Sequence, residues 1–440
     1  MILINLTNFN LKIIFEFSWF SKIYINFNWG NILFQIDGIS IIFIFLSNIL
    51  TLVCIISSLN SIQKFVKEYY VNLFLINFLL IGLFLCCDLL LFYVFFELIL
   101  IPIFLIIIIW GSREEKYKAS YYFFFYTLLG SLFMLISIFL IFKQIGSTNI
   151  INLNYLNLEN QIIFSLAFFF SLAVKIPMFP VHIWLPQAHV EAPVAGSILL
   201  AGILLKLGGY GFLRFFITLF NYGSEFWNPL ILTLSLLSII YGSIITIKQT
   251  DIKRLIAYSS VSHMGFVTLG IFSHTIEGLI AAIFIMLAHG FVSSGLFILA
   301  TTVYDRFNSR IIRSYRGLLI SMPILASLFF LYTLANVSFP GTLNFWGEIL
   351  AFKASLNCVL GLNFTFFILL TLIFGALYSF NLFNSLFLGG GNNLLFPRDL
   401  IKNEIYSLII LLFFSFFYGI FANKLFNFIW MDLHKLLMMS

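Results

Sequence analysis

Four ionisable side chains lie inside long apolar stretches of this sequence, where no bulk water solvates them. They are Glu97 in "LLLFYVFFELILIPIF", Lys175 in "SLAVKIPMF", Lys206 in "LLAGILLKLGGYGFL" and Glu348 in "LNFWGEILAF". A charge at the centre of a bilayer costs roughly 2.5–3.5 kcal/mol on insertion scales, so such residues are typically functional. Two acids and two bases in separate stretches therefore predict a proton relay. A static ion pair between Glu97 and Lys175 that braces two helices is the structural alternative.

Two histidines extend this set. His263 in "YSSVSHMGF" and His289 in "IMLAHGFVSSG" stand beside serines and glycines, which leave room for water. Imidazole exchanges protons near neutral pH, so both are candidate relay groups, although a buried histidine can also be a packing residue. His182 and His189 are seven residues apart and do not form the HExxH pattern, so the sequence predicts no metal site.

The composition indicates what must position these groups. Of 440 residues, 62% are apolar and 9% are charged, which excludes an ordinary soluble globular protein. The apolar runs are long enough for helices and too long for the strands of a membrane barrel. We therefore predict an all-α polytopic membrane protein with about twelve transmembrane helices. The predicted spans are 38–58, 71–87, 88–110, 119–143, 162–190, 194–220, 229–248, 255–273, 278–303, 318–350, 363–388 and 405–428.

Lysine and arginine gather in every second loop between these spans. The basic loops contain Lys64, Lys67, Arg113, Lys116, Lys118, Lys248, Lys253, Arg254, Arg306, Arg310, Arg313, Arg316, Arg398 and Lys402. Such alternation is typical of membrane topology, and it explains the net charge of +6 without a nucleic-acid partner. Both termini are expected on the less basic face. Residues 15–29, "FEFSWFSKIYINFNW", alternate aromatic and polar residues, so we expect a non-spanning segment over residues 1–35.

Two of the predicted spans are interrupted by proline. Span 162–190 contains Phe179-Pro180, and span 318–350 contains Phe339-Pro340. Proline removes a helical hydrogen bond, and lipid cannot satisfy the carbonyls that this frees. Paired breaks in two halves of a chain indicate an inverted-repeat transporter architecture. Kinks in two long tilted helices are the simpler alternative.

Several motifs resemble a known family. "FFELILIP", "VKIPMFPVHIWLPQAHVEAPVAGSILLAGILLKLGGYGFLR", "QTDIKRLIAYSSVSHMGFV", "LAHGFVSSGLF" and "NFWGE" look very similar to subunit 4 of NADH dehydrogenase (ubiquinone), in the antiporter-like, proton-pumping subunit family of mitochondrial respiratory complex I. The resemblance covers roughly residues 36–430. That family usually has two further N-terminal helices, whereas the resemblance here begins near Gln35.

The resemblance implies two inverted five-helix repeats, over 71–220 and 229–388. A first transmembrane helix and basic loop would occupy 36–70, and a C-terminal helix and tail would occupy 389–440. By motif, Glu97 and Lys175 would form the proton-input pair and Lys206 the central lysine. His263 and His289 would link Lys206 to an exit residue, Glu348. The supporting residues would be His182, His189, Pro180 and Pro340.

The resemblance also implies a function and a location. The chain would translocate protons across the mitochondrial inner membrane, driven by redox chemistry on FMN, iron–sulfur clusters and ubiquinone in other subunits, and it would bind no cofactor itself. Its partners would be the antiporter-like subunits 2 and 5, accessory subunits and phospholipids. The basic loops would face the matrix and the termini the intermembrane space. The alternatives are a subunit of a stand-alone cation/proton antiporter and an inactive structural spacer.

Overall fold

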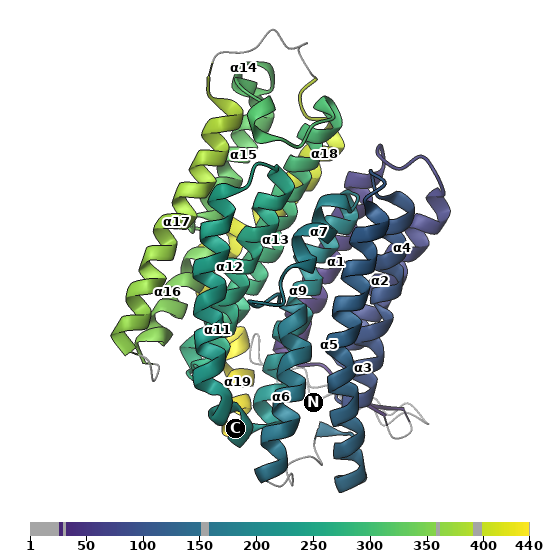
Figure 1. Cartoon of the computed structure of the whole chain (residues 1–440), viewed down its shortest axis with the longest axis vertical. Helices are drawn as coiled ribbons and strands as arrows, with labels where there is room; N and C mark the ends of the chain where they lie inside the picture. The colour runs from purple at the N-terminus through teal and green to yellow at the C-terminus, as the bar shows by residue number, and fades with distance from the viewer. Residues whose placement is uncertain (1–25, 30–31, 151–157, 358–360, 390–397, 440) are drawn as a thin grey trace, which may run out of the picture.

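The computed structural model of the chain describes residues 26–29, 32–150, 158–357, 361–389 and 398–439, and almost all of these residues are helical. Ten of the described helices are long and apolar enough to cross a membrane. Together with two broken helices they confirm the predicted all-α, multi-pass architecture (Figure 1).

The continuous long helices are α1 (Gly38–Ser58), α2 (Val66–Leu85), α5 (Lys116–Ile145), α11 (Asn221–Lys248), α12 (Ile252–Phe272), α13 (Ile276–Phe307), α17 (Gly361–Phe387) and α18 (Lys402–Ile420). Two further spans consist of consecutive helical pieces. One is α3 (Leu89–Leu98) followed by α4 (Leu100–Trp110), and the other is α8 (Val194–Leu199), the π-helical turn η2 (Leu200–Leu204), α9 (Leu205–Gly211), the π-helical turn η3 (Phe212–Phe216) and α10 (Ile217–Leu219).

The two broken spans are α6 (Leu158–Lys175) with α7 (Trp184–Glu191), and α15 (Pro323–Asn336) with α16 (Leu343–Leu356). The remaining elements are the strands β1 (Asn26–Trp29) and β2 (Ile32–Gln35), the 3₁₀ turn η4 (Ile312–Ser314), the short helix α14 (Leu318–Ser321) and the C-terminal helix α19 (Ala422–Met439). The predicted span 405–428 was wrong in extent, because one helix ends at Ile420 and another begins at Ala422.

The described part of the N-terminal segment forms an antiparallel hairpin in which Asn26 pairs with Gln35. Of the predicted segment 1–35, residues 1–25 lie outside the described residues. Phe34 forms an isolated β-bridge with Cys86 at the end of α2, which attaches the hairpin to the helical body. Arg214 in η3 forms an ion pair with Asp37, immediately before α1.

The predicted division of the chain near Asp88 is confirmed, because α2 ends at Leu85 and α3 begins at Leu89. The Asp88 side chain accepts hydrogen bonds from the amides of Leu90 and Leu91, as a helix N-cap does. Asp251 caps α12 in the same way, through the amides of Lys253 and Arg254.

The residues just before α3 and just before α12 each pair with a distant segment through the same pattern of backbone hydrogen bonds. Leu89 N donates to Thr148 O and Ile150 N donates to Cys87 O, while Ile252 N donates to Arg310 O and Ile312 N donates to Thr250 O. A bridge joins Asp88 to Asn149 in one case and Asp251 to Ile311 in the other. The same small motif therefore occurs once in each half of the chain, as expected for two structural repeats.

A side-chain hydrogen bond of the same kind spans each of the two helix breaks. Trp184 Nε1 donates to Val174 O at 2.9 Å across the first break, and Asn344 Nδ2 donates to Ala335 O at 2.9 Å across the second. In each case a side chain at the start of the second piece satisfies a carbonyl near the end of the first. Pro180 and Pro340 lie within the two breaks, between the helical pieces.

The basic loops lie at one end of the molecule, the upper end in Figure 1. Hydrogen bonds connect them: Trp110 Nε1 donates to Lys64 O, Arg310 donates to Ser112 Oγ, and Arg306 Nε donates to Arg398 O. The first half of the chain, from α1 to α10, occupies one side of the molecule, and α11 to α17 occupy the other.

Candidate functional site

The most deeply buried spans carry three of the candidate residues. An 18-residue apolar stretch of the α8–α10 span and one of α13 are fully buried, and that of α12 is 94% buried, whereas in the other long helices at most 61% of such a stretch is buried. Lys206 lies in α9, His263 in α12 and His289 in α13, and all three side chains are buried. The fold therefore turns these groups toward each other and away from lipid.

Lys206 and His289 are in direct contact across the boundary between the two halves. Lys206 Nζ lies 2.8 Å from His289 Nδ1, and it also donates to the carbonyl of Ala201. Ala201 belongs to the π-helical turn η2, a type of irregularity that is frequent at functional sites. Among the described residues, Lys206 has no acidic partner within ion-pair distance.

This contact has two chemically distinct forms. A lysine ammonium can donate to an unprotonated Nδ1, or a neutral lysine amine can accept from a protonated Nδ1. The two forms differ by the transfer of one proton along a 2.8 Å hydrogen bond. The geometry therefore suits proton exchange between Lys206 and His289.

His263 continues the line toward Glu348. The rings of His263 and His289 have centroids 5.7 Å apart, and His263 Nδ1 lies 3.7 Å from Glu348 Oε1. Glu348 belongs to α16, the second piece of the broken helix, and its side chain is buried. Four of the six predicted transfer residues thus lie in one group of neighbouring side chains, in which Lys206 and His289 are within hydrogen-bond distance of each other.

Asn336, which sequence reasoning missed, orients His263. Its Oδ1 atom lies 3.2 Å from His263 Nε2, and its Nδ2 atom donates to the Tyr378 hydroxyl at 3.5 Å. Because an amide oxygen can only accept, this contact favours a proton on Nε2 of His263. The opposite nitrogen, Nδ1, is then free to exchange a proton with Glu348.

A small cavity of about 20 Å³ adjoins this group. Its lining includes His263, Asn336, Glu348, Tyr378 and Ser262. A polar cavity of roughly 10–15 Å³ or more can hold one water molecule that has several partners. The site between His263 and Glu348 is therefore large and polar enough for a bridging water.

Glu97 and Lys175 form a second group. Their charges are close enough to interact, but no nitrogen–oxygen distance between them is 4 Å or less, so they do not form an ion pair. Lys175 Nζ instead lies 4.3 Å from the centre of the Phe96 ring, in a cation–π contact. Within the described part of the chain, neither Glu97 Oε1 nor Lys175 Nζ has a hydrogen-bond partner. The static brace considered as an alternative is therefore not formed.

No hydrogen bond or ion pair between described residues joins Lys175 to Lys206. Their helices are nevertheless close, because a Cβ atom on Gly208 of α9 would lie 2.5 Å from Ile176 Cγ1 and 2.9 Å from Leu172 O. The glycine permits this approach, whereas any larger residue would push α9 away from the break. The Glu97 group and the Lys206 group are thus separate clusters on adjoining elements.

The two supporting histidines lie in different surroundings. His189 in α7 is stacked on Phe297 with ring centroids 4.5 Å apart, and it lies within electrostatic range of Lys206 and Lys253. His182, in the first break, packs among the rings of Phe179, Tyr241 and Tyr258. Only His189 adjoins the Lys206 group.

Two basic residues assigned to loops by sequence are in fact buried. Lys253 is the second residue of α12, and its Nζ donates to Ala192 O at 3.1 Å. Arg310 donates to Glu191 Oε1 at 2.8 Å and to Ser112 Oγ at 2.7 Å. The sequence did not reveal this burial, because it results from packing between loops of the two halves, which are far apart along the chain.

The fold and this site define a class of protein. Two similar halves, a closed helix break in each, and buried basic, imidazole and carboxyl groups at their boundary are typical of membrane subunits that move ions. The chain belongs to the family described as NADH:quinone oxidoreductase/Mrp antiporter, transmembrane, which matches residues 86–375.

Its relatives include NADH-ubiquinone oxidoreductase chain 4 of Metridium senile, with 48% identity over 90% of this chain and 81% of that protein. Among solved structures, respiratory complex I from Thermus thermophilus with bound NADH contains a chain with 31% identity and a TM-score of 0.84, covering 92% of this chain and 85% of that one. A chain of the Mrp complex from Dietzia sp. DQ12-45-1b has a TM-score of 0.82 at 20% identity, with coverage of 90% and 83%, and shows the shared fold alone.

Proposed function

We propose that this chain is a membrane-arm subunit of respiratory complex I, of the chain 4 type, and that it translocates protons across the mitochondrial inner membrane. Redox chemistry on FMN, iron–sulfur clusters and ubiquinone would take place in other subunits. The support is the relationship to proteins named NADH-ubiquinone oxidoreductase chain 4, together with the similarity to a chain of complex I. Its partners would be the antiporter-like subunits 2 and 5, accessory subunits and phospholipids. The basic loops would face the matrix, and the termini the intermembrane space.

The observation that carries this proposal is the group formed by Lys206, His289, His263 and Glu348. A proton on Lys206 can pass to His289 along their 2.8 Å contact. It can then cross between the imidazoles, whose centroids are 5.7 Å apart, and reach Glu348 from His263 Nδ1. Glu348 would release it on the less basic side.

Glu97 and Lys175 would control when this happens. At a separation of ~6 Å and an effective dielectric constant of about 20, two opposite charges attract each other by roughly 2.8 kcal/mol. A movement that separates Glu97 from Lys175 would therefore favour loss of the lysine proton. The change in charge at Lys175 would act on Lys206 through space, because α6 and α9 lie close together at Gly208.

One such ion-pair change is too small to drive transport. Moving a proton against ~180 mV requires about 4 kcal/mol, because 100 mV corresponds to roughly 2.3 kcal/mol per charge. Several steps must therefore be concerted. His189 is placed to take part, because it lies within electrostatic range of both Lys206 and Lys253.

The decisive experiment replaces Lys206 by alanine in the assembled complex and measures protons pumped per electron in vesicles. We expect the proton yield to fall while NADH oxidation by an artificial acceptor is unchanged. Lys353→Ala is the matched control, because Lys353 is an exposed lysine paired with Glu277. An unchanged proton yield in Lys206→Ala would contradict the proposal.

The second candidate function, a subunit of a stand-alone cation/proton antiporter, is favoured by the family description, which also names the Mrp antiporter, and by the fold shared with the Mrp chain. Such a protein should transport sodium in vesicles without NADH. Native purification separates the two readings, because a complex I subunit co-migrates with subunits that carry flavin and iron–sulfur clusters. An inactive spacer should tolerate neutralising Glu97 and Glu348 together.

A further inference from the structure

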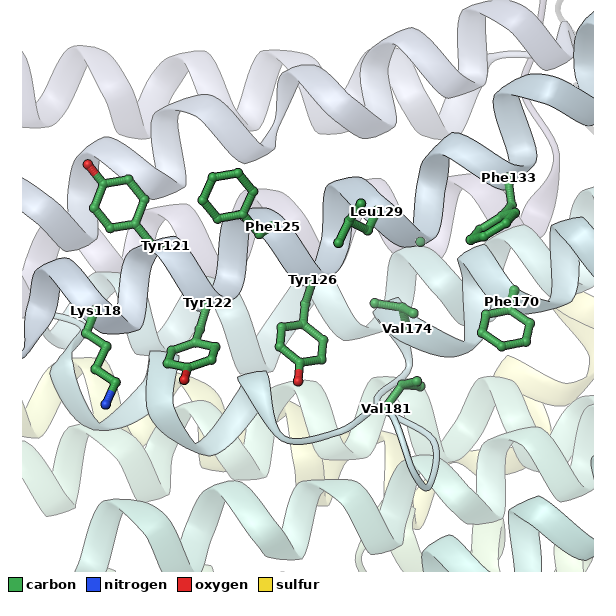
Figure 2. A pocket seen from close by; sticks show the side chains of 11 residues that line it. Lys118, Tyr121, Tyr122, Phe125, Tyr126, Leu129, Phe133, Phe170, Val174 and Val181 are labelled. Carbon is green, nitrogen blue, oxygen red and sulfur yellow. The ribbon is translucent and has the colours of Figure 1, made fainter.

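A long apolar groove runs along the outer face of α5, beside α6 and the first helix break (Figure 2). Its volume is about 530 Å³. Aromatic side chains of α5, among them Tyr122, Tyr126 and Phe133, line one wall, and Val174 and Val181 line the other. Figure 2 shows Lys118, Tyr122 and Tyr126 leaving α5 in the same direction.

We propose that this groove binds one anionic phospholipid of the membrane, with an acyl chain along α5 and the phosphate at Lys118. The lining extends along α5 from Lys118 to Phe133. At 1.5 Å per residue, these fifteen steps correspond to roughly 22 Å. One leaflet, including its headgroup layer, has about the same thickness, roughly 20–22 Å.

The groove has a charged end and an apolar end, like the headgroup and acyl chains of a phospholipid. The end at Lys118 is basic and belongs to the basic face of the molecule, and the far end, with Phe133 and Phe170, is wholly apolar. Lys118 is exposed and forms no ion pair with any described residue. Its Nζ lies 5.9 Å from the centre of the Tyr122 ring, at the level where lysine and tyrosine commonly meet lipid headgroups.

The groove lining includes Gly130 of α5 and Val174 of α6, where the two helices lie close together. A Cβ atom on Gly130 would lie 2.9 Å from Val174 Cγ2, so only glycine allows this approach. Val174 is the residue before Lys175.

A helix of a partner subunit fits this groove less well. A spanning helix needs contacts through the whole ~30 Å hydrocarbon core and has a diameter of about 10–12 Å. The groove ends at Phe133, within one leaflet. Its single cation at the headgroup level matches a phosphate better than an apolar helix.

The test uses the intact complex in vesicles that contain phosphatidylglycerol with a photoactivatable acyl chain. A parallel sample contains phosphatidylcholine with the same chain. We expect phosphatidylglycerol adducts on the α5 residues of the groove, located by mass spectrometry. Lys118→Ala should reduce this labelling about fivefold, the order expected for one lysine–lipid charge contact.

Two further variants make the test specific. Leu129→Trp fills the groove and should reduce labelling by both lipids, while Lys143→Ala, at the other end of α5, should leave labelling unchanged. Equal labelling of wild type and Lys118→Ala would overturn the proposal. So would crosslinks from these residues to a helix of another subunit in place of lipid adducts. Assembly of each variant is checked on a native gel.

Discussion

The two buried lysines Lys206 and Lys175 are in contact mainly with neutral groups. Lys206 contacts a carbonyl and an imidazole, and Lys175 lies over an aromatic ring. A buried ion pair stabilises both charges at once, so removing a proton from it is costly. Dipoles and rings bind a cation more weakly, which lets these residues change protonation without a large penalty.

Asn336 is expected to position the proton on His263. Asn336→Leu removes the acceptor for Nε2–H, so both neutral forms of the imidazole become populated. One hydrogen bond contributes about 1 kcal/mol, so the form that can exchange with Glu348 should fall about fivefold relative to the other. We expect a lower proton yield per electron and an altered pH dependence of pumping, measured in vesicles.

Two variants distinguish this role from simple packing. Asn336→Asp keeps an oxygen acceptor and should retain most of the proton yield. Tyr378→Phe removes the 3.5 Å contact to Asn336 Nδ2 without touching His263, and should have a small effect. Equal losses in Asn336→Leu and Asn336→Asp would show that the acceptor is not what matters.

At the scale of elements, the two breaks place different residues at equivalent positions. α6 ends at Lys175 and α15 ends at Asn336, and each is followed by a similar pattern of backbone hydrogen bonds. Ile176 N donates to Leu172 O in the first break, and Val337 N donates to Thr333 O in the second. The first half thus has Lys175 at this position, whereas the second half has Asn336, whose side-chain amide orients His263.

The indole of Trp184 is expected to hold the first break closed. Trp184→Phe leaves Val174 O unsatisfied in a buried site, which should destabilise the chain by about 1–3 kcal/mol. Trp110→Phe is the matched control, because Trp110 Nε1 donates to Lys64 O at the exposed end, where water can replace it. The measurement is thermal melting of the purified complex. Equal shifts for the two variants would contradict this interpretation.

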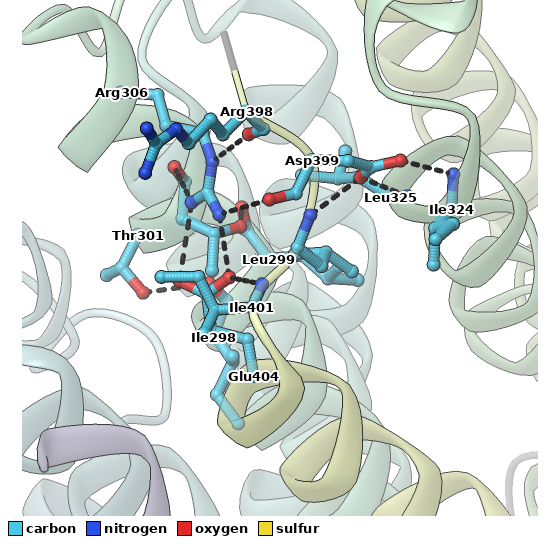
Figure 3. A network of polar contacts seen from close by, with 12 residues as sticks. Ile298, Leu299, Thr301, Arg306, Ile324, Leu325, Arg398, Asp399, Ile401 and Glu404 are labelled. Carbon is cyan, nitrogen blue, oxygen red and sulfur yellow. Dashed lines mark hydrogen bonds and ion pairs between the residues drawn. The ribbon is translucent and has the colours of Figure 1, made fainter. Parts of the chain in front are cut away.

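The second broken helix is fixed at its start by a polar network on the basic face (Figure 3). Asp399 accepts from the amides of Ile324 and Leu325, the second and third residues of α15. Arg306 at the end of α13 donates to Glu404 in the first turn of α18 and to Asp399 O. α13, α15 and α18 are therefore joined at one point, far along α15 from Asn336.

At the scale of the whole molecule, the two halves are joined by a buried ion pair on the basic face. Glu191 lies in α7 of the first half, and Arg310 follows α13 of the second, with their charged atoms 2.8 Å apart. Their side chains are 4% and 2% exposed, so solvent screens this pair little.

Removing one partner should therefore be more harmful than removing both. Arg310→Gln leaves a buried carboxylate unpaired, which typically costs about 3–5 kcal/mol. The double variant Glu191→Gln, Arg310→Gln should recover much of this loss. Thermal melting of the assembled complex measures the coupling. Strictly additive losses would show that the two side chains act independently.

The sequence by itself determined the class of fold, the approximate number of spans, the two breaks and the six candidate transfer residues. Length and apolarity decide whether a segment can cross a bilayer, and proline and charge stand out against apolar sequence because lipid penalises both. These signals are local, so they can be read along one chain. The end of α18 at Ile420 was missed because the apolar run continues through the turn.

Only the tertiary structure decided which of these residues meet. Lys206 and His289 are 83 positions apart, and His263 and Asn336 are 73 apart, yet both pairs are within hydrogen-bond distance. It also separated Glu97 and Lys175 into a cluster of their own and buried Lys253 and Arg310, which had resembled ordinary loop charges. Contacts between helices depend on how the two halves pack, and no spacing within one helix encodes that packing.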